Sequence, residues 1–571
     1  MKKIYTFLLC FAVMCSTAMA QTLFTLDKQF QSPEREVRAM WLTTLKGLDW
    51  PKQPARTLEG AERQKEELCH ILDQLQAAGI NTVMFQSRIR STTAYPSAIE
   101  PWDGVFTGTP GKAPSYDPLQ FALDECHRRG MELHAWVVAF PICDVADARK
   151  LGRKALPVRK PKLCQRCGTK WMMDPGVPGT AEHIASICAE IVKKYEVDGI
   201  HLDYVRYPEK GISFTDRRTY RRYGNGQRLA DWRRANVTRT VQAIHDSVKT
   251  VRQWVKISCS PVGKYADLNQ QSSYGWNARD AVYQEAQSWL REGLMDMLFP
   301  MMYFDGKHFY PFAIDWQENA YGRQIVPGLG IYFLHEKQKD WELDIIRRQM
   351  FFLRDIGAAG QAHFRSEFFT DNVKGLYDFS AQDFYKQPVL PPAMTWEDSI
   401  APATPQTKIS ERNNSIHLEW TPVKDNKENT SVTYNIYYCK DSLFVRGEAQ
   451  PLAYRVKDCH YDYQPGLPTT LRGYYAVTAM DVFGNESDAI AVSAFDSIAS
   501  STKTVPADGY LDIPDVDKAE YLLVLDMAER HLFTTPYKNR IYVGKLAPGS
   551  YEVRTLARKG ISHHLFHFWK E

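Results

Sequence analysis

The run Asp198-Gly199-Ile200-His201-Leu202-Asp203-Tyr204-Val205 holds the residues of this chain that are best suited to chemistry. Successive side chains of a strand point to opposite faces, so His201, Asp203 and Val205 share one face. A carboxylate at the end of a buried strand costs free energy unless it is hydrogen-bonded or has a function. We therefore predict that Asp203 is functional, with a structural ion pair to Arg206 as the alternative. Asp198 opens the strand and is predicted to be structural.

The elements that must position Asp203 repeat along the chain. From Val37 to about Phe369, short apolar runs alternate with segments of helical period, such as Leu68, Ile71, Leu72 and Leu75. This alternation indicates βα units around a parallel sheet. Strands are predicted near residues 37–43, 82–87, 132–139, 199–205, 256–260, 297–303, 325–332 and 358–364. We predict an α/β fold, a (β/α)₈ TIM barrel over residues 34–386, with its chemistry at the strand ends.

An open, doubly wound sheet would fit the same alternation. That fold normally has a glycine-rich phosphate turn after its first strand, and Thr43-Thr44-Leu45-Lys46-Gly47 is not such a turn. The barrel is therefore the preferred prediction.

The start of the chain reads as a targeting segment. Lys2 and Lys3 precede an apolar run and the small-residue pattern Ala18-Met19-Ala20, which predicts a signal peptide over residues 1–20. No later stretch is apolar enough for a transmembrane segment. We expect an exported protein that is periplasmic, at the cell surface or extracellular.

The composition narrows the possible partners. A hydrophobic share of 44% and a formal net charge of +4 exclude a disordered chain and a polycation that coats nucleic acid. Of eleven cysteines, two lie in the predicted signal peptide, and the odd number that remains argues against a full disulfide framework. We expect no nucleic-acid partner, and the oligomeric state stays open.

The sequence changes character after Lys386. Residues 387–405 are rich in proline and predict a semi-rigid linker. Residues 406–500 alternate at period two between turns, which predicts a β-sandwich. With Trp420-Thr421-Pro422 early and Asp481-Val482-Phe483-Gly484-Asn485 late, this segment resembles a fibronectin type III module. Residues 501–571 predict a small β-rich terminal domain.

Three separated motifs carry a further resemblance: Arg35–Leu42, Trp171–Gly176 and Asp198–Pro208. In this order they resemble the family-10-like glycoside hydrolases, secreted bacterial barrel proteins that also carry fibronectin-type modules. The resemblance covers about Glu34 to Tyr385. It implies hydrolysis of glycosidic bonds, with a cell-wall glycan or another polysaccharide or oligosaccharide as substrate. We expect no cofactor.

A second carboxyl group is needed for the usual paired-carboxylate chemistry, at about 5–5.5 Å for retention or about 6.5–9.5 Å for inversion. The strand is similar to the DGxDxDxE signature of family-18 chitinases, but Val205 stands where that family has its acid. The candidates therefore lie at other strand ends: Asp305, Glu336 and Glu367. Asp305 ranks first, because a Tyr-x-Asp at the sixth strand end could reach across the barrel mouth.

Side chains around the rim are predicted to orient the substrate. Hydrogen bonds to sugar hydroxyls, or to a carboxylate-bearing sugar such as a muramic acid, are expected from Gln86, Arg88, Arg90, His201, Arg206 and Tyr207. Stacking on a sugar face is expected from Trp41, Trp136 and Tyr303. Packing inside the barrel is the alternative for each aromatic residue.

Cys164-Gln165-Arg166-Cys167 has zinc-knuckle spacing, in a basic loop between the third strand and its helix. A structural zinc site needs two more ligands, so a local disulfide or two free thiols is the preferred prediction, with no metal site.

Two function classes lead, and a structural envelope protein held by its β-modules is a weaker third class. The leading hypothesis is an exported glycoside hydrolase in which Asp203 acts with a second carboxylate. The alternative is a non-catalytic glycan-binding envelope protein, in which Val205 marks lost chemistry.

Overall fold

The computed structural model describes residues 32–570 except 210–211, 270–275, 413–414, 428–429, 441, 465–472, 494–502, 515–518, 527–529 and 557–561. The predicted signal peptide lies outside the described residues. The chain divides into two compact units, residues 1–400 with 482–485, and residues 401–481 with 486–571.

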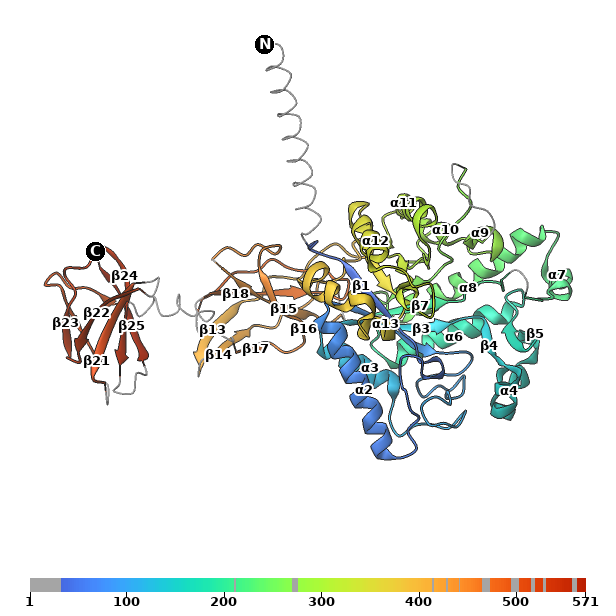
Figure 1. Cartoon of the computed structure of the whole chain (residues 1–571), viewed down its shortest axis with the longest axis horizontal. Helices are drawn as coiled ribbons and strands as arrows, with labels where there is room; N and C mark the ends of the chain where they lie inside the picture. The colour runs from blue at the N-terminus through green and yellow to red at the C-terminus, as the bar shows by residue number, and fades with distance from the viewer. Residues whose placement is uncertain are drawn as a thin grey trace, which may run out of the picture. The chain divides into compact units, whose positions relative to one another are not determined.

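The first unit is built on a parallel sheet that closes into a barrel (Figure 1). Its strands follow the order β10-β9-β8-β7-β3-β2-β1-β12-β11. Their bounds are β1 Val37–Leu42, β2 Thr82–Arg88, β3 Glu132–Val138, β7 Gly199–Asp203, β8 Lys256–Cys259, β9 Met297–Leu298, β10 Gln324–Ile325, β11 Gly328–Leu329 and β12 Gly360–His363. All eight predicted strand positions are occupied, which confirms the predicted fold class.

The seventh strand is broken into β10 and β11. Pro327 lies between the two pieces and has no N–H to donate to a neighbouring strand. The segment still bonds on both sides: the Val326 N–H donates to Leu298 O (2.8 Å), and the Ala362 N–H donates to Pro327 O (3.0 Å). The barrel is therefore closed through this interrupted strand.

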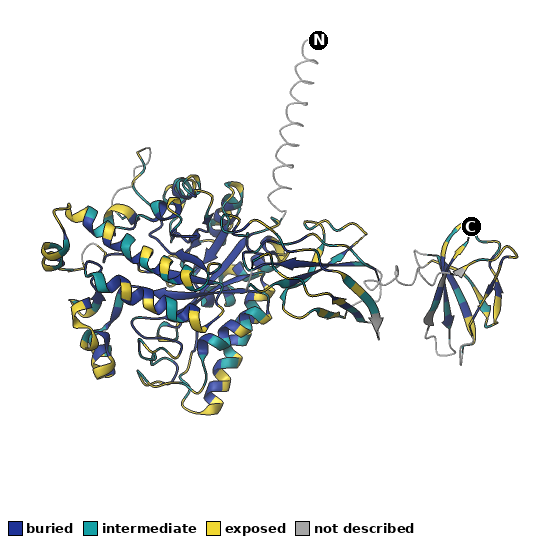
Figure 2. Ribbon diagram, turned by 180° about the vertical axis from the view of Figure 1, so that it is seen from behind, coloured by how far each residue is buried: buried dark blue, intermediate teal, exposed yellow. Residues whose placement is uncertain are grey.

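Helices cover the outside of the barrel, as Figure 2 shows by their exposed outer faces and buried inner faces. The main ones are α2 Leu58–Ala77, α3 Pro118–Arg128, α6 Pro178–Lys194, α8 Leu229–Val251, α10 Ala286–Arg291 and α12 Leu343–Asp355. Helix α2 begins where the Thr57 side chain accepts a hydrogen bond from the Gly60 N–H. It buries Leu68, Leu72 and Leu75, the stripe that predicts it. Shorter helices are α7 Arg217–Tyr223, α9 Ala278–Ala281, α11 Tyr310–Glu318, α13 Ser366–Thr370 and α14 Leu376–Phe379.

An insertion follows β3. It contains a three-stranded sheet of order β4-β6-β5, with β4 Pro141–Asp144, β5 Cys164–Cys167 and β6 Lys170–Met173, and the short helices α4 Val145–Leu151 and α5 Leu156–Arg159. The sequence predicts only a basic loop here. Cys164 and Cys167 are both free thiols. Among the described residues, no three metal-binding side chains gather into a possible metal site.

The proline-rich stretch after Lys386 begins as part of the barrel unit. Asn81 donates to Val389 O (2.9 Å), the Glu36 N–H donates to Leu390 O (3.0 Å), and Trp396 donates to Asp296 (3.0 Å). Glu36, Asn81 and Asp296 lie just before β1, β2 and β9. Residues 387–396 therefore pack against the amino-terminal end of the barrel. The sequence predicts a linker for these residues.

The second unit consists of small sheets. Strands β13 Thr407–Arg412, β14 Ser415–Trp420 and β17 His460–Tyr463 form one, and β15 Thr433–Cys439, β16 Gln450–Val456 and β18 Tyr474–Met480 form another. Leu418, Ile436 and Val477 share one hydrophobic core, so the two sheets pack face to face. The remaining strands form a five-stranded and a two-stranded sheet: β19 Lys503–Thr504, β20 Tyr510–Asp512, β21 Tyr521–Asp526, β22 His531–Pro536, β23 Arg540–Tyr542, β24 Gly549–Leu556 and β25 Ser562–Lys570.

Within the described residues, no helix has the length and apolar character needed to cross a membrane.

Candidate functional site

Asp203 is the last residue of β7, opposite Val138 of the neighbouring strand β3. It is 6% exposed. Its carboxylate accepts three hydrogen bonds, from the Tyr204 N–H (2.7 Å), the Ser260 hydroxyl (3.1 Å) and the Trp136 indole N–H (3.3 Å). These donors come from β3, the turn after β7 and the residue after β8, so three neighbouring strands fix the orientation of one carboxyl group.

Burial raises the pKa of Asp203, because removal from water penalises the charged form. The positive charge of Arg206 and the three hydrogen bonds act in the opposite direction and do not fully offset burial. A carboxyl group with a raised pKa keeps its proton to higher pH. It is therefore suited to donate that proton to a leaving group.

The turn after β7 brings Tyr204 and Arg206 together. Tyr204 has a φ of 51°, a left-handed conformation that is unusual for a bulky side chain, and its N–H points back to Asp203. Strained backbone of this kind is concentrated at functional sites. The Arg206 guanidinium lies 4.6 Å from the Tyr204 ring centroid, 5.5 Å from that of Trp276, and pairs with Glu209 (3.1 Å). The Nε atom of Arg206 is buried and has no hydrogen-bond partner among the described residues.

Tyr303 lies within electrostatic range of the same carboxyl group. Burial, followed by the negative charge of Asp203, raises the pKa of Tyr303 well above its ordinary value, so its phenol keeps its proton. Its ring is half-buried and packs against Tyr332 and Phe364, with centroids 5.7 and 5.6 Å away. Tyr303 therefore offers a ring edge and a hydroxyl donor near Asp203.

Trp41 and His201 lie inside the barrel. The Trp41 indole donates to His201 Nε2 (3.1 Å), so that atom is the acceptor and Nδ1 carries the proton toward Ser258 Oγ (3.0 Å). Burial holds the pKa of His201 well below its usual range, and the ring is neutral. Both side chains are buried and paired with each other, so the packing alternative replaces the expected contact with substrate.

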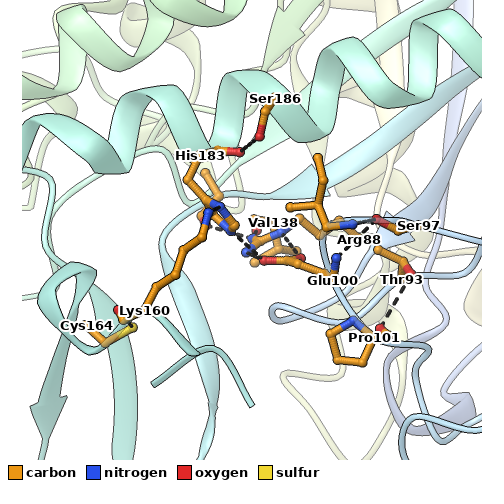
Figure 3. A network of polar contacts seen from close by, with 12 residues as sticks. Arg88, Thr93, Ser97, Glu100, Pro101, Val138, Lys160, Cys164, His183 and Ser186 are labelled. Carbon is orange, nitrogen blue, oxygen red and sulfur yellow. Dashed lines mark hydrogen bonds and ion pairs between the residues drawn. The ribbon is translucent and has the colours of Figure 1, made fainter. Parts of the chain in front are cut away.

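Arg88 also departs from its predicted role (Figure 3). Its guanidinium forms two hydrogen bonds to Glu100 (2.7 Å each) and donates to the backbone oxygens of Val138 and Ala139. Both ion-pair side chains are fully buried, and His183 adds a contact to Glu100 (3.0 Å). Arg88 is thus a structural residue that holds the end of β3, and its expected role in binding substrate is wrong.

A bulge explains the misplaced Arg88. In the pairing of β2 with β3, the register shifts between Gln86 and Arg88, so strict alternation no longer places the two side chains on one face. Gln86 keeps its position near the barrel mouth. Its Oε1 accepts from the Thr43 hydroxyl (2.7 Å) and the N–H groups of Thr44 (3.0 Å) and Leu45 (2.9 Å), which shapes the turn after β1.

Tyr207 is buried next to the rim. Its hydroxyl accepts from Asn236 (3.1 Å), and its ring packs against Phe214 and Tyr283. It lines a cavity of about 680 Å³ together with Trp276. A substrate contact would therefore use its ring edge.

None of the three candidates for the second carboxylate is among the hydrogen-bond partners of Asp203 in the described residues. Asp305 is exposed, in extended backbone two residues after Tyr303. Glu336 is exposed. Glu367 pairs with Arg365 (2.6 Å) and Lys52 (3.1 Å); burial raises its pKa, but these two cations outweigh burial and hold it below the ordinary value. The pairing of Asp203 with a second acid stays a prediction.

Comparison with known sequences decides the class of the protein. The family described as Glycosyl hydrolase-like 10 matches residues 36–333, more than half of the chain. This chain belongs to the glycosyl hydrolase-like 10 family. The matched residues of this family member include Asp203, Tyr303 and Asp305, and end before Glu336 and Glu367.

Two relatives are also named glycosyl hydrolases. Glycosyl hydrolase YngK of Bacillus subtilis is 29% identical over 480 residues, which cover 80% of this chain and 92% of the relative. Glycosyl hydrolase DigH of Escherichia coli K12 is 33% identical over 293 residues, 48% of this chain and 67% of the relative. Among solved structures, the PgaB glycoside hydrolase domain of Bordetella bronchiseptica aligns at 14% identity and a TM-score of 0.43, covering 61% of this chain and 98% of that domain. With its relatives, this family member is a glycosyl hydrolase.

Sequence reasoning missed several residues of this glycosyl hydrolase. Ser260 is the last residue of the fifth predicted strand, and its position at that strand end was the available signal. Tyr204 lies in the Asp203 motif, but only the backbone reveals its left-handed turn. Trp276 lies far from any predicted strand end, and no sequence signal connects it to Arg206.

Proposed function

We propose that this chain is an exported glycoside hydrolase that cleaves O-glycosidic bonds of a bacterial cell-wall glycan or a related polysaccharide, with Asp203 as the proton donor. The observation that carries the proposal is the buried Asp203 carboxyl at the barrel mouth, whose pKa burial raises while three donors hold it in place. Export is supported by the signal-peptide pattern of residues 1–20.

In the proposed reaction, Asp203 gives its proton to the glycosidic oxygen as the bond from that oxygen to the anomeric carbon breaks. A second carboxylate then supports the positive charge on the sugar, either by bonding to it or by taking a proton from the attacking water. We assign this second role to Asp305. It follows Tyr303 by two residues in extended backbone, it is exposed, and it lies within the residues that the family matches.

The substrate class rests on the resemblance of the motifs and on the residues around the mouth. Sugar rings bind to aromatic faces and edges through their C–H groups and to polar side chains through their hydroxyls. Tyr303, Tyr204 and Arg206 supply both kinds of contact beside Asp203. For residues 406–500 we keep the fibronectin type III-like assignment, and we propose that they space the barrel from a surface.

Release of reducing ends from a panel of polysaccharides, including peptidoglycan glycan stripped of its peptides, tests the proposal. Wild type should cleave at least one of them, and Asp203→Asn should lose activity by about a thousandfold or more. Asp124→Asn, on the exposed face of α3, is the matched control and should retain full activity. Asp305→Asn should lose at least a hundredfold.

Three outcomes would count against parts of the proposal. Full activity of Asp203→Asn would remove Asp203 from the chemistry. Full activity of Asp305→Asn, with loss in Glu336→Gln or Glu367→Gln, would move the second role to that residue. A wild type that is retained on one glycan but cleaves none would favour the glycan-binding alternative.

A further inference from the structure

Two cavities open among the loops at the carboxyl ends of the barrel strands. The first, here the aromatic pocket, has a volume of about 680 Å³ and is lined by residues that include Tyr207, Glu209, Phe214, Trp276, Asn277 and Tyr283. The second, here the charged pocket, has a volume of about 540 Å³ and is lined by residues that include Lys46, Arg90, Asp103, Asp144, Asp147 and Lys150. Both volumes fall in the range of ligand sites, about 300–1,000 Å³.

The two pockets belong to different strands of the barrel. The aromatic pocket is formed mainly by the segments that follow β7 and β8, and the charged pocket by those that follow β1, β2 and β3. In the order of the sheet, β7 is next to β3. Asp203, at the end of β7, therefore lies at the border between the two groups of loops.

Side-chain interactions connect the pockets across Asp203. On one side, Arg90 of the charged pocket acts electrostatically on Tyr204, the residue after Asp203. On the other side, the Arg206 guanidinium lies over the rings of both Tyr204 (4.6 Å) and Trp276 (5.5 Å). Tyr204 directly follows Asp203 in the chain, so the electrostatic effect of Arg90 and the Arg206 contact meet at the residue next to the carboxyl group.

The chemistry of each pocket suits part of a glycan. In the aromatic pocket, Tyr207 and Tyr283 pack edge to face (5.3 Å), and Trp276 is partly exposed beside Glu209 and Asn277. An aromatic wall with a few polar groups is the usual setting for a sugar ring. The Arg206 guanidinium lies over the Trp276 ring and places a positive charge beside this pocket.

The charged pocket offers hydrogen-bonding groups of both signs. Lys150 is paired with Asp147 (2.9 Å), and Asp103 accepts from the Thr92 hydroxyl (2.6 Å), while Arg90 is partly exposed. Such a pocket suits the hydroxyl, amide and carboxylate groups of a second sugar.

We propose that the barrel mouth binds a glycan chain in both pockets at once and cleaves it internally, so that the enzyme is endo-acting with at least one sugar unit on each side of the scissile bond. The proposal rests on the proposed function, because it takes Asp203 as the point of cleavage. An enzyme that removes units from a chain end needs a subsite closed on one side, and here one cavity lies among the loops after β7 and β8 and the other among those after β1, β2 and β3.

The experiment compares product lengths from a polymer that the wild type cleaves. Separation by size at less than one-tenth conversion should yield oligosaccharides of many lengths, and a polymer whose two ends are chemically blocked should be cleaved at the same rate. Release of one short product, together with loss of activity on the blocked polymer, would overturn the proposal while leaving the proposed function intact. Absence of cleavage of any glycan would instead overturn the proposed function.

Variants test the two pockets separately. Trp276→Ala should raise KM for the polymer by about five- to tenfold with kcat within about threefold, because the lost contact holds the chain away from the broken bond. Arg90→Ala should act in the same direction, about threefold or more. Tyr321→Ala and Arg291→Ala are matched controls at the opposite end of the barrel, both exposed, and should leave KM unchanged. An unchanged KM in both pocket variants would overturn the assignment of the pockets.

Discussion

Glu100 and Asp203 are both carboxyl groups buried near the carboxyl ends of the barrel strands, and their environments differ. Glu100 forms a two-bond ion pair with Arg88 and a further contact with His183. Burial alone would raise its pKa, but these partners outweigh burial and lower it to about 2. Asp203 accepts hydrogen bonds from three uncharged donors and has a raised pKa.

The difference separates a carboxylate whose charge is offset by buried cations from one whose burial is not fully offset. Glu100 stays charged under all ordinary conditions, and its charge fixes the end of β3 through Arg88. Asp203 is also held in place, by three hydrogen bonds, but burial raises its pKa and so favours its protonated form. Firm placement with an adjustable charge is what general acid catalysis requires.

The contrast between Glu100 and Asp203 is tested most strongly by replacing each carboxyl group in turn with its uncharged amide. Asp203→Asn should lower kcat/KM by about a thousandfold or more, while its thermal midpoint stays the same or rises, since the wild-type charge is disfavoured by burial. Glu100→Gln should keep kcat within about tenfold of wild type in the folded fraction. Reducing-end release and thermal unfolding measure both, and a catalytic loss of equal size in the two variants would contradict the comparison.

The free energy of unfolding should fall more in Glu100→Gln than in Asp203→Asn, the reverse of the order expected for activity. Glu100→Gln leaves the buried Arg88 guanidinium without a charge partner, and loss of one partner of a buried pair costs about 3–5 kcal/mol. Urea unfolding followed by tryptophan fluorescence gives this value for the barrel. The exposed pair Arg63–Glu59 supplies the control, since Glu59→Gln should change the free energy of unfolding by less than about 0.5 kcal/mol.

The same ion pair predicts a pH dependence of stability. The pKa of Glu100 is about 2 in the folded protein, below its ordinary value of 4.5. A group with a lowered folded pKa stabilises above its unfolded pKa, and this contribution is lost as pH falls toward 2. The difference in unfolding free energy between wild type and Glu100→Gln should be full at pH 6 and decrease below about pH 4.5. A difference that stays constant down to pH 3 would be inconsistent with the ion pair.

The pH dependence of kcat/KM should follow the protonation of Asp203. If its protonated form is the proton donor, kcat/KM falls as pH rises through its raised pKa. This descending limb should be the same in Glu100→Gln as in wild type. If the fall of kcat/KM with pH shifted in Glu100→Gln, the titration of Asp203 would depend on Glu100, and the two carboxyl groups would not be independent.

The smallest expected effect sharpens the description of Asp203 itself. The Ser260 hydroxyl donates to the carboxylate at 3.1 Å and thereby lowers the pKa of Asp203. In Ser260→Ala the descending limb should move to higher pH, with kcat at its optimum within about tenfold. Ser258→Ala, which removes the hydroxyl beside His201, is the control and should leave the limb in place.

The sequence predicts the barrel well because hydrophobic periodicity decides which residues face the sheet. All the strand positions and the helix α2 follow from it. Asp198, predicted to be structural, contacts His127 (2.9 Å) and the Leu133 N–H (2.8 Å). Asp203 was found because a polar residue in an apolar strand is conspicuous.

The site is less predictable, because alternation assumes regular pairing. The bulge near Ser87 breaks that assumption and turns Arg88 away from the mouth. Whether an aromatic residue binds sugar or fills the barrel also depends on its depth along the strand, which put Trp41 inside and left Tyr303 half-buried. Trp276 was missed because only the folded chain brings it to Arg206.

The break at Pro327 makes the seventh strand the weakest part of the barrel wall in terms of regular strand pairing. On this side, β9 is joined to β12 only by two short pieces of strand, and one peptide nitrogen has no hydrogen to share. Amide protons along residues 324–329 should therefore exchange with solvent deuterium sooner than those of β2 or β3. The interrupted strand lies three strands around the barrel from Asp203, so local opening of the wall there need not move the Asp203 carboxyl.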